Sequence, residues 1–491
     1  MKDIRDTKSG EPRVMVVIPP TRLHRNRDIG FKELLPHIGV AYVSAAFEAA
    51  GACVQIVDSV AERLDLDAIM SRFRAFRPHI LGLTASTYQV HEADGVARAA
   101  RSADPHVHIM LGGYHVSALP QRTLEEFPVY DAAMYGEAEA TAMEYVEKWR
   151  RGEAVEDVAG TAVRGADGAI TVNPPREAPQ DLDALPFPAF HLMPLDRYRG
   201  FYSMHASHEH PLTMCTARGC PYHCIFCFKS TGSRYRMRSV DDVMQEMDRS
   251  MERFHPTQIV FTDEIFTFDK ERTKAFCERM ISKGYHECLH WICQDRVDLA
   301  DFETLKLMKR AGCTTVSYGI ESGSQEIIRS IRKNFKLEQA REAINMTKQA
   351  GIWADTNFII GHPGDTPDTV RETIDFAISL DPDSTSFAIL CPFPGTEVAR
   401  MAAAGEGGLR LLSEDWTTYG KQVGEALELE NISRPVLERF HRLAYMRFYL
   451  RRGKWLSLFR VVNLGAIPIY AWHTASVLIK SLFARTGHKP T

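Results

Sequence analysis

The sequence has little of several features that define a protein class. The net charge over 491 residues is only -4, so overall electrostatics give no indication of a nucleic-acid partner. The first residues, MKDIRDTKSGEPRVMVVIPP, lack the apolar segment and the small-residue cleavage site of a secretory signal. We therefore expect a cytoplasmic protein.

Cysteine is also scarce, with ten in the whole chain. A cytoplasmic protein is not expected to carry a disulfide framework, so clustered cysteines indicate metal binding or catalysis. Four of the ten lie in one stretch, CTARGCPYHCIFCFK, at residues 215–229. The others stand in apolar surroundings, and we expect them to be small buried hydrophobes. They are Cys53, Cys277, Cys288, Cys293, Cys313 and Cys391.

The first third of the chain alternates short apolar runs with helical patterns, which predicts a parallel, doubly wound α/β domain over residues 1–170. In such a sheet, ligands bind at the carboxyl ends of the strands. Gly112, Gly113 and Gly136 each follow a predicted strand and allow either a tight turn or close approach of a ligand. No GxGxxG follows the first run, which argues against a dinucleotide site. The runs are residues 14–18, 54–58, 80–85, 107–111 and 131–135.

A second alternating series follows a proline-rich segment. Residues 171–205 are predicted to be a linker. Residues 206–410 contain about six βα units, fewer than the eight of a closed triose-isomerase barrel, so we expect a partial (β/α)6 barrel. The cysteine stretch falls in the loop after the first strand of this series, where βα folds place their chemistry.

The last segment, residues 411–491, is predicted to be a helical extension. No acidic residue follows Glu438, while basic and aromatic residues alternate to the end of the chain. Residues 461–479 carry no charge. This composition favours a helix on an anionic membrane surface, which would make the protein peripheral at the inner face of the membrane. The alternative is a helical pair packed on the protein with a solvated basic face.

Cys220, Cys224 and Cys227 have the spacing CxxxCxxC. Zinc sites usually recruit two separated ligand pairs, and no second CxxC pair occurs in the sequence. Three thiolates suit three irons of a [4Fe–4S] cluster and leave the fourth iron open to another ligand. Cys215 belongs to the preceding predicted strand, so we do not expect it to be a ligand.

The stretch CPYHCIFC, with Phe226 before its third cysteine, resembles the signature of radical S-adenosylmethionine enzymes. The resemblance implies that S-adenosylmethionine binds the open iron and yields a radical that abstracts hydrogen. FTDEIF, WICQDR and YGIESGS resemble strand ends that contact this cofactor in the family. The implied contacts are Phe226, Asp263, Glu264, Arg296 and Glu321. The alternative for the charged residues is a set of structural salt bridges across the barrel mouth.

The first third resembles the cobalamin-binding domain of one branch of this family, through PHIGVAYVSAAFEAAGACVQIVD, ILGLTAS, LGGYH and YGEAEAT. A DxHxxG motif, whose histidine coordinates cobalt in other cobalamin enzymes, is missing here, as it generally is in this branch. His115 is therefore a candidate contact, or a turn residue near the corrin, or simply solvated. The implied cobalamin contacts are Thr84, Ser86, Gly112, Gly113, His115, Gly136 and Glu137.

The resemblance implies a cobalamin-dependent methyl transfer to an unactivated carbon, with a flavodoxin or ferredoxin as low-potential electron donor. The basic, aromatic tail favours an apolar or natural-product substrate such as a lipid, a hopanoid or a tetrapyrrole. A ring-forming or ring-contracting enzyme is the alternative, and a non-enzymatic iron–sulfur protein is a distant one. Methylthiotransferases carry three further cysteines in the N-terminal domain, where this chain has only Cys53.

Overall fold

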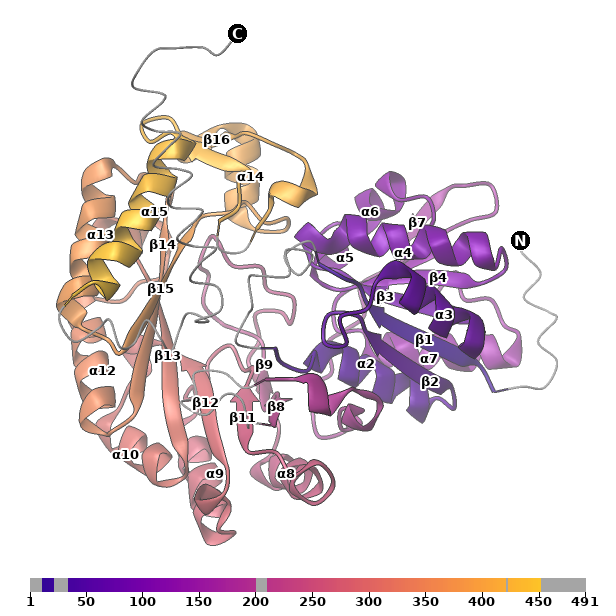
Figure 1. Ribbon diagram of the computed structural model, residues 1–491, viewed down its shortest axis with the longest axis horizontal. Helices are drawn as coiled ribbons and strands as arrows, with labels where there is room; N and C mark the ends of the chain where they lie inside the picture. The colour runs from indigo at the N-terminus through magenta and orange to yellow at the C-terminus, as the bar shows by residue number, and fades with distance from the viewer. Residues whose placement is uncertain (1–10, 22–33, 200–209, 421–422, 452–491) are drawn as a thin grey trace.

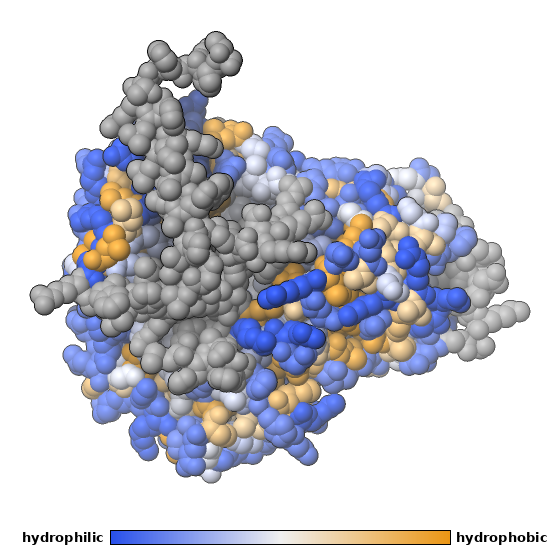
Figure 2. Space-filling view, viewed as in Figure 1, coloured by the Kyte–Doolittle hydropathy of each residue, from blue (hydrophilic) through white to orange (hydrophobic). Residues whose placement is uncertain are grey.

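The computed structural model describes residues 11–21, 34–199, 210–420 and 423–451. Two sheets, each with its own helices, lie side by side (Figure 1), the N-terminal one in indigo and violet and the second in pink to orange. On the face that Figure 2 shows, both hydrophilic and apolar residues are visible among the described residues. The predicted α/β class with two successive units is confirmed.

The N-terminal sheet has seven strands in the order β2-β1-β3-β4-β5-β6-β7. The first five are parallel, as predicted, and their apolar runs are buried because helices cover both faces. Helices α2 and α7 pack together, as do α3 and α4. The strands are β1 Arg13–Ile18, β2 Cys53–Asp58, β3 Ile80–Thr84, β4 His108–Gly112, β5 Ala132–Met134, β6 Thr161–Arg164 and β7 Ile170–Val172. The helices are α2 Ile38–Ala49, α3 Leu66–Phe76, α4 Val90–Ala103, α5 Tyr114–Ala118, α6 Pro120–Glu126 and α7 Glu139–Arg151.

Two strands at one side of this sheet do not appear among the predicted elements. β6 pairs antiparallel with β5, and β7, at the edge, pairs antiparallel with β6. β7 ends at Val172, inside the segment predicted as a linker. Both strands are short, at four and three residues, and β7 is largely exposed, so neither leaves a periodic apolar signal.

The second sheet is a six-stranded, all-parallel partial barrel in the order β15-β14-β13-β12-β11-β8, which confirms the prediction of six βα units. Its strands are β8 Pro211–Met214, β11 Gln258–Phe261, β12 His290–Asp295, β13 Cys313–Glu321, β14 Trp353–Ile360 and β15 Ser384–Ile389. Its helices are α8 Val240–Phe254, α9 Lys270–Ser282, α10 Phe302–Arg310, α11 Gln325–Ser330, α12 Leu337–Gln349, α13 Pro367–Leu380 and α14 Glu397–Ala404.

Local chemistry explains where the barrel elements begin and which way they face. The side chains of Ser239, Asp269 and Asp301 accept hydrogen bonds from the first turns of α8, α9 and α10, and so cap these helices. Along β14, Phe358 and Ile360 are buried, whereas Asn357, just before Phe358, is partly exposed and bonds to Ser317 of β13. The alternation gives the barrel an apolar outer layer and a polar inner face.

The C-terminal helix α15, Arg434–Tyr449, packs on β15. The Tyr449 hydroxyl donates to the Thr385 carbonyl at 2.7 Å, and Phe440 and Phe448 are buried. This part of the predicted extension therefore packs on the protein, as in the alternative above. The remainder, including residues 461–479, lies outside the described residues. Within the described ranges, every helix is too short or too polar to cross a membrane.

Candidate active site at the mouth of the barrel

The three predicted cluster ligands lie on one loop. Residues 219–235 connect two short antiparallel strands, β9 Ala217–Arg218 and β10 Arg236–Met237, between β8 and α8. Cys220, Cys224 and Cys227 are free thiols, and each is at least partly exposed. The loop thus stands at the carboxyl ends of the barrel strands, where the sequence predicts it.

This loop is anchored on the barrel. The backbone N–H of Ile225 donates to the Ile331 carbonyl at 3.2 Å, and the Val398 N–H donates to the Ile225 carbonyl at 3.1 Å. Phe228 lies against Gly395, where a β-carbon would stand 2.6 Å from the ring. The barrel therefore holds the segment between the second and third cysteines.

The donor set fits an iron–sulfur cluster. Within the described ranges, no three His, Cys, Asp or Glu side chains surround a common point as a single metal ion requires. A [4Fe–4S] cluster instead binds each thiolate at a separate iron, so its ligands stand further apart. Partial burial raises the pKa of the Cys224 thiol, and that of the Cys227 thiol to about 11, while the positive charge of Lys333 opposes both shifts. Lys333 thus favours the thiolate form that iron needs.

Glu321, a predicted cofactor contact, forms a buried ion pair at the end of β13. Lys333 Nζ lies 2.6 Å from Glu321 Oε1, and both side chains are about nine-tenths buried. Glu321 has φ = 74°, a left-handed conformation that non-glycine residues rarely adopt and that concentrates at functional sites. The sequence analysis missed Lys333, which no motif marks.

Arg296 contacts the cluster loop directly. Its guanidinium lies 3.5 Å from the centre of the Tyr222 ring, a cation–π contact. It also donates to Asp298 at 2.9 and 3.0 Å and to the Lys333 carbonyl at 2.8 Å. Part of its role is therefore the structural salt bridge given above as the alternative, and its contact with S-adenosylmethionine stays a prediction.

Asp263 and Glu264, at the end of β11, face different surroundings. Asp263 is fully buried and accepts hydrogen bonds from the Thr216 N–H at 2.6 Å and the Thr216 hydroxyl at 2.5 Å. Burial raises the pKa of Asp263 to about 6. Glu264 is exposed and accepts a hydrogen bond from Thr231 of the cluster loop at 2.5 Å. Of the two, Glu264 has the access that a cofactor contact requires.

His362 is a second residue that the sequence analysis missed. It follows β14 and is fully buried, with its ring 5.6 Å from that of Phe226. Neither ring nitrogen has a hydrogen-bond partner of normal geometry among the described residues. Burial lowers the pKa of His362 to about 3, so the imidazole is neutral. Only the Glu321 backbone interacts with the imidazole, and a buried polar group whose hydrogen bonds are incomplete is costly, which makes it a sign of a ligand.

The rim of the N-terminal sheet presents small, accessible residues. Most of the predicted cobalamin contacts lie here at the ends of β3, β4 and β5, partly or fully exposed: Thr84, Ser86, Gly112, Gly113 and Gly136. A β-carbon at Gly113, where φ is 101°, would stand 2.6 Å from the Ala85 carbonyl oxygen. Glycine thus lets two rim loops approach each other closely. We call the surface formed by Thr84, Ser86, Gly112, Gly113 and Gly136 the ledge, and it carries no bulky side chain.

Two predicted cobalamin contacts point elsewhere. His115 is 1% exposed and packs edge-on against Trp416 with ring centres 5.0 Å apart. Burial lowers the pKa of His115 to about 4. The Glu137 carboxylate forms ion pairs with Arg218 and Arg236 of the barrel. The ledge therefore offers no imidazole from His115, in keeping with the missing DxHxxG motif, and contacts of both residues with cobalamin stay predictions.

Tyr114, between Gly113 and His115, is a rim residue that also interacts electrostatically with the barrel mouth. Its side chain is 59% exposed, the largest exposure of a described aromatic residue on the rim. Partial burial of the hydroxyl raises the pKa of Tyr114, and the negative charge of Glu264 raises it further. A tyrosine of the rim is thus within electrostatic reach of the ends of β8 and β11 in the barrel.

Comparison with known proteins agrees with this geometry. Residues 214–377 match the Radical SAM superfamily, and residues 29–146 match the B12 binding domain. An uncharacterised methyltransferase of Pyrococcus horikoshii is 32% identical over 441 residues, covering 89% of this chain and 93% of the relative. The hopanoid C-3 methylase of Methylococcus capsulatus is 24% identical, covering 74% and 68%. The anaerobic magnesium-protoporphyrin IX monomethyl ester cyclase of Rubrivivax gelatinosus is 28% identical, covering 77% and 68%.

Solved structures share the fold. The radical S-adenosylmethionine methyltransferase TsrM of Kitasatospora setae, with cobalamin and a [4Fe–4S] cluster bound, superimposes with a TM-score of 0.69 at 18% identity, covering 90% of each chain. The cobalamin-dependent radical enzyme OxsB superimposes with a TM-score of 0.73 at 17% identity, covering 95% of this chain and 71% of that one.

The two matched domains and the three-cysteine loop define the class, an enzyme with a B12-binding domain and a radical S-adenosylmethionine barrel. The chain belongs to the cobalamin-dependent radical S-adenosylmethionine methyltransferase family that includes the Pyrococcus horikoshii protein. Its cofactors are a [4Fe–4S] cluster, S-adenosylmethionine and cobalamin.

Proposed function

We propose that this enzyme transfers a methyl group to an unactivated carbon of an apolar or natural-product substrate, such as a lipid, a hopanoid or a tetrapyrrole, held between the rim and the barrel mouth. The observation that carries the proposal is Tyr114. It is exposed on the rim, where the cobalamin contacts are predicted, and lies within electrostatic reach of Glu264 at the barrel mouth. Methyl donor and radical source must reach one substrate carbon, and two sites that open on one space meet that requirement.

The residues at the barrel mouth have distinct proposed roles. Cys220, Cys224 and Cys227 hold the cluster, which with S-adenosylmethionine supplies a hydrogen-abstracting radical when bound, while cobalamin supplies the methyl group. Phe226 and His362 form one wall of the S-adenosylmethionine site, and the neutral imidazole offers that cofactor a hydrogen bond.

Charged residues complete the S-adenosylmethionine site. The Lys333–Glu321 pair presents a cation and a carboxylate beside the cluster loop, matching the amino and carboxylate groups of the cofactor's methionine end. Glu264 adds an accessible carboxylate, and Arg296 holds the loop in place through Tyr222. Asp263 holds Thr216 in position by accepting a hydrogen bond from its backbone N–H.

On the other side, we propose that the ledge holds cobalamin through rim backbone and small side chains. Thr84 and Ser86 offer hydroxyls, and Gly112, Gly113 and Gly136 allow close approach of the corrin. His115 and Glu137 belong to the structure that supports this ledge.

Anaerobic reconstitution with and without cobalamin tests the function. With a substrate extract of isoprenoid lipids or tetrapyrroles, we expect both 5′-deoxyadenosine and S-adenosylhomocysteine, the latter only when cobalamin is present. Deoxyadenosine without S-adenosylhomocysteine would support the ring-forming alternative and contradict methyl transfer. A Cys220→Ala control should form neither product.

We propose a flavodoxin or ferredoxin as the electron donor, because Cys227 is exposed and its loop carries an exposed Lys229–His223 contact of 3.2 Å. An acidic donor would be attracted by this basic contact, so Lys229→Glu should slow cluster reduction by the donor and leave chemical reduction unchanged. Membrane contact rests on residues 452–491, outside the described ranges. Flotation of the full chain with anionic liposomes tests it, and recovery of all protein below the lipid would contradict it.

A further inference from the structure

The cluster loop, residues 219–235, begins and ends at the strand pair β9–β10, which we call its neck. Arg218 and Arg236 face each other in the register of β9 and β10. Gly219 follows with φ = 90°, and a β-carbon there would overlap the Arg234 carbonyl. The N–H of Cys220 then donates to the Gly232 carbonyl at 3.2 Å. The first predicted ligand thus lies directly behind the neck, so the geometry of the neck determines where Cys220 stands.

A carboxylate from the other domain closes this neck. Glu137 comes from the loop after β5, and its Oε2 accepts from Arg218 Nη1 at 2.9 Å. Both nitrogens of the Arg236 fork donate to the same carboxylate, one of them at 3.3 Å. Glu137 therefore bridges the two strands of the neck, which lie 81 and 99 residues further along the chain.

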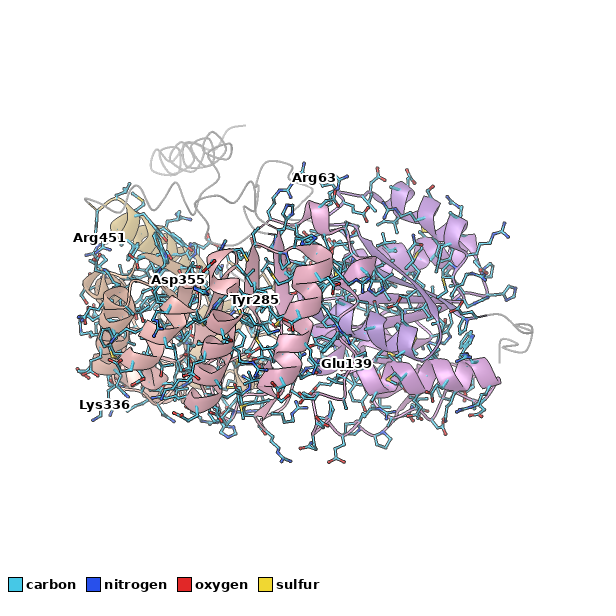
Figure 3. All side chains as sticks on the ribbon, turned by 90° about the horizontal axis from the view of Figure 1, so that it is seen from below. Arg63, Glu139, Tyr285, Lys336, Asp355 and Arg451 are labelled. Carbon is cyan, nitrogen blue, oxygen red and sulfur yellow. The ribbon has the colours of Figure 1, made fainter. Side chains whose placement is uncertain are left out.

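Glu139 lies two residues after Glu137 in the chain but contacts only one strand of the neck. It opens α7 at the border between the two domains (Figure 3) and accepts from Arg218 Nη2 at 2.7 Å. No contact of Glu139 with Arg236 occurs among the described ion pairs. Both glutamates and both arginines are between 3% and 8% exposed. Glu139 thus matches Glu137 in charge and burial but does not bridge the neck.

Charge makes the bridge necessary. Two guanidinium groups on facing residues of a strand pair repel each other, and out of water this repulsion is strong. Glu137 neutralises it at the point where the strands meet. Removing one partner of a buried ion pair leaves an uncompensated charge, which is strongly destabilising locally. Without Glu137 the strands of the neck should separate.

We infer that Glu137 is a positioning residue for the iron–sulfur cluster, and that it links the cobalamin ledge to the cluster loop. Gly136, next to it, is exposed on the ledge with φ = 75°, and its N–H donates to the Ser117 hydroxyl at 3.1 Å. A corrin on the ledge orders the loop after β5, and the Glu137 carboxylate on that loop then holds the neck closed. The B12-binding domain thereby fixes the place of Cys220.

Hydrogen exchange of the cluster-free full chain tests the positioning role. In Glu137→Gln, peptides from residues 219–235 should exchange about tenfold faster than in the wild type, because the amide of Cys220 loses its protected bond. In the matched control Glu139→Gln, the change should stay within about twofold. Equal exchange in Glu137→Gln and wild type, or equal acceleration in the two variants, would overturn the inference.

Glu137→Asp covers the case in which Glu137→Gln does not fold. It keeps the buried charge, but the shorter side chain reaches only one strand of the neck. It should accelerate exchange of residues 219–235 in the same direction, and unchanged exchange would count against the bridge.

Hydroxocobalamin added to cluster-free protein tests the link between the domains. It should slow exchange of residues 219–235 in the wild type and in Glu139→Gln, but not in Glu137→Gln. Slowing of similar size in Glu137→Gln, in a sample where the ledge peptides confirm that cobalamin is bound, would show that the corrin acts on the cluster loop by another route. After reconstitution, the electron paramagnetic resonance signal of the reduced cluster should broaden in Glu137→Gln alone, since Cys220 is no longer held in one position.

Discussion

Lys333 Nζ and Glu321 Oε1, 2.6 Å apart, occupy the space that a side chain at residue 319 would fill. A β-carbon on Gly319 would stand 2.5 Å from the Glu321 oxygen and 2.8 Å from the Lys333 nitrogen. Gly319 is the first glycine of YGIESGS, and its φ is not positive. The adjacent ion pair, rather than an unusual backbone conformation, therefore explains why this position is a glycine.

Gly319→Ala should therefore break this pair. The methyl group would displace the ends of two buried charged side chains, at a cost of at most about 3 kcal/mol in the free energy of unfolding. It should also weaken S-adenosylmethionine binding, because the pair lies beside the cluster loop. Urea unfolding and equilibrium dialysis measure the two effects. Gly95→Ala, in a helix with open space around the new β-carbon, is the control and should be neutral or stabilising.

The cysteines differ in whether they can bind iron. Alanine at Cys220, Cys224 or Cys227 should abolish the charge-transfer absorption of the reconstituted cluster and lower the iron content severalfold. Cys215→Ala should keep both. Burial and the nearby Asp263 charge raise the pKa of Cys215 to about 12, and its thiol donates to the Ala217 carbonyl at 3.3 Å. Loss of the cluster in Cys215→Ala would assign it a role that its environment does not support.

The fold was largely predictable because its signals are local. Apolar runs and helix caps, such as Ser239 before α8, lie within a few residues of each other and give the order of strands and helices. Two of the six cysteines that were predicted to be buried are not. Cys53 and Cys288 are exposed, contrary to the prediction, because they lie at the edges of their elements.

The site was predictable only where a motif carried it. The cysteine spacing identified the cluster loop from the residues alone. Lys333 and His362 could not be found this way, because their roles depend on the left-handed turn at Glu321 and on burial against Phe226. Glu137 was placed on the rim from the sequence, but its arginine partners are set by how two domains dock, which no local pattern records.

His115 should make the protein sensitive to acid. Its folded-state pKa of about 4 lies below the ordinary value of 6.5, so the unfolded chain binds the proton more readily. The stability that this residue contributes is present above pH 6.5 and is lost as the pH falls toward 4, by at most about 3 kcal/mol. His115→Phe keeps the edge-on contact with Trp416 and should remove this dependence. Urea unfolding of both proteins at several pH values measures it, and parallel curves would contradict the prediction.

His362 should affect ligand binding and stability in opposite directions. Its two ring nitrogens are buried and make no hydrogen bond of normal geometry among the described residues, with only a weak contact to the Glu321 backbone, so His362→Leu should stabilise the cluster-free protein by about 1 kcal/mol. If the imidazole bonds to S-adenosylmethionine, the same change should raise the dissociation constant of that cofactor about tenfold in reconstituted protein.

The matched control for His362 is His441, whose Nε2 bonds to the Phe387 carbonyl at 2.9 Å far from the cluster loop. His441→Leu loses that bond, so it should destabilise the protein and leave S-adenosylmethionine affinity unchanged. Both substitutions remove an imidazole. His362→Leu should raise stability and weaken S-adenosylmethionine binding, whereas His441→Leu should lower stability and leave that binding unchanged. If His362→Leu destabilises the protein without altering affinity, the imidazole is a packing group and the wall that it forms with Phe226 does not contact the cofactor.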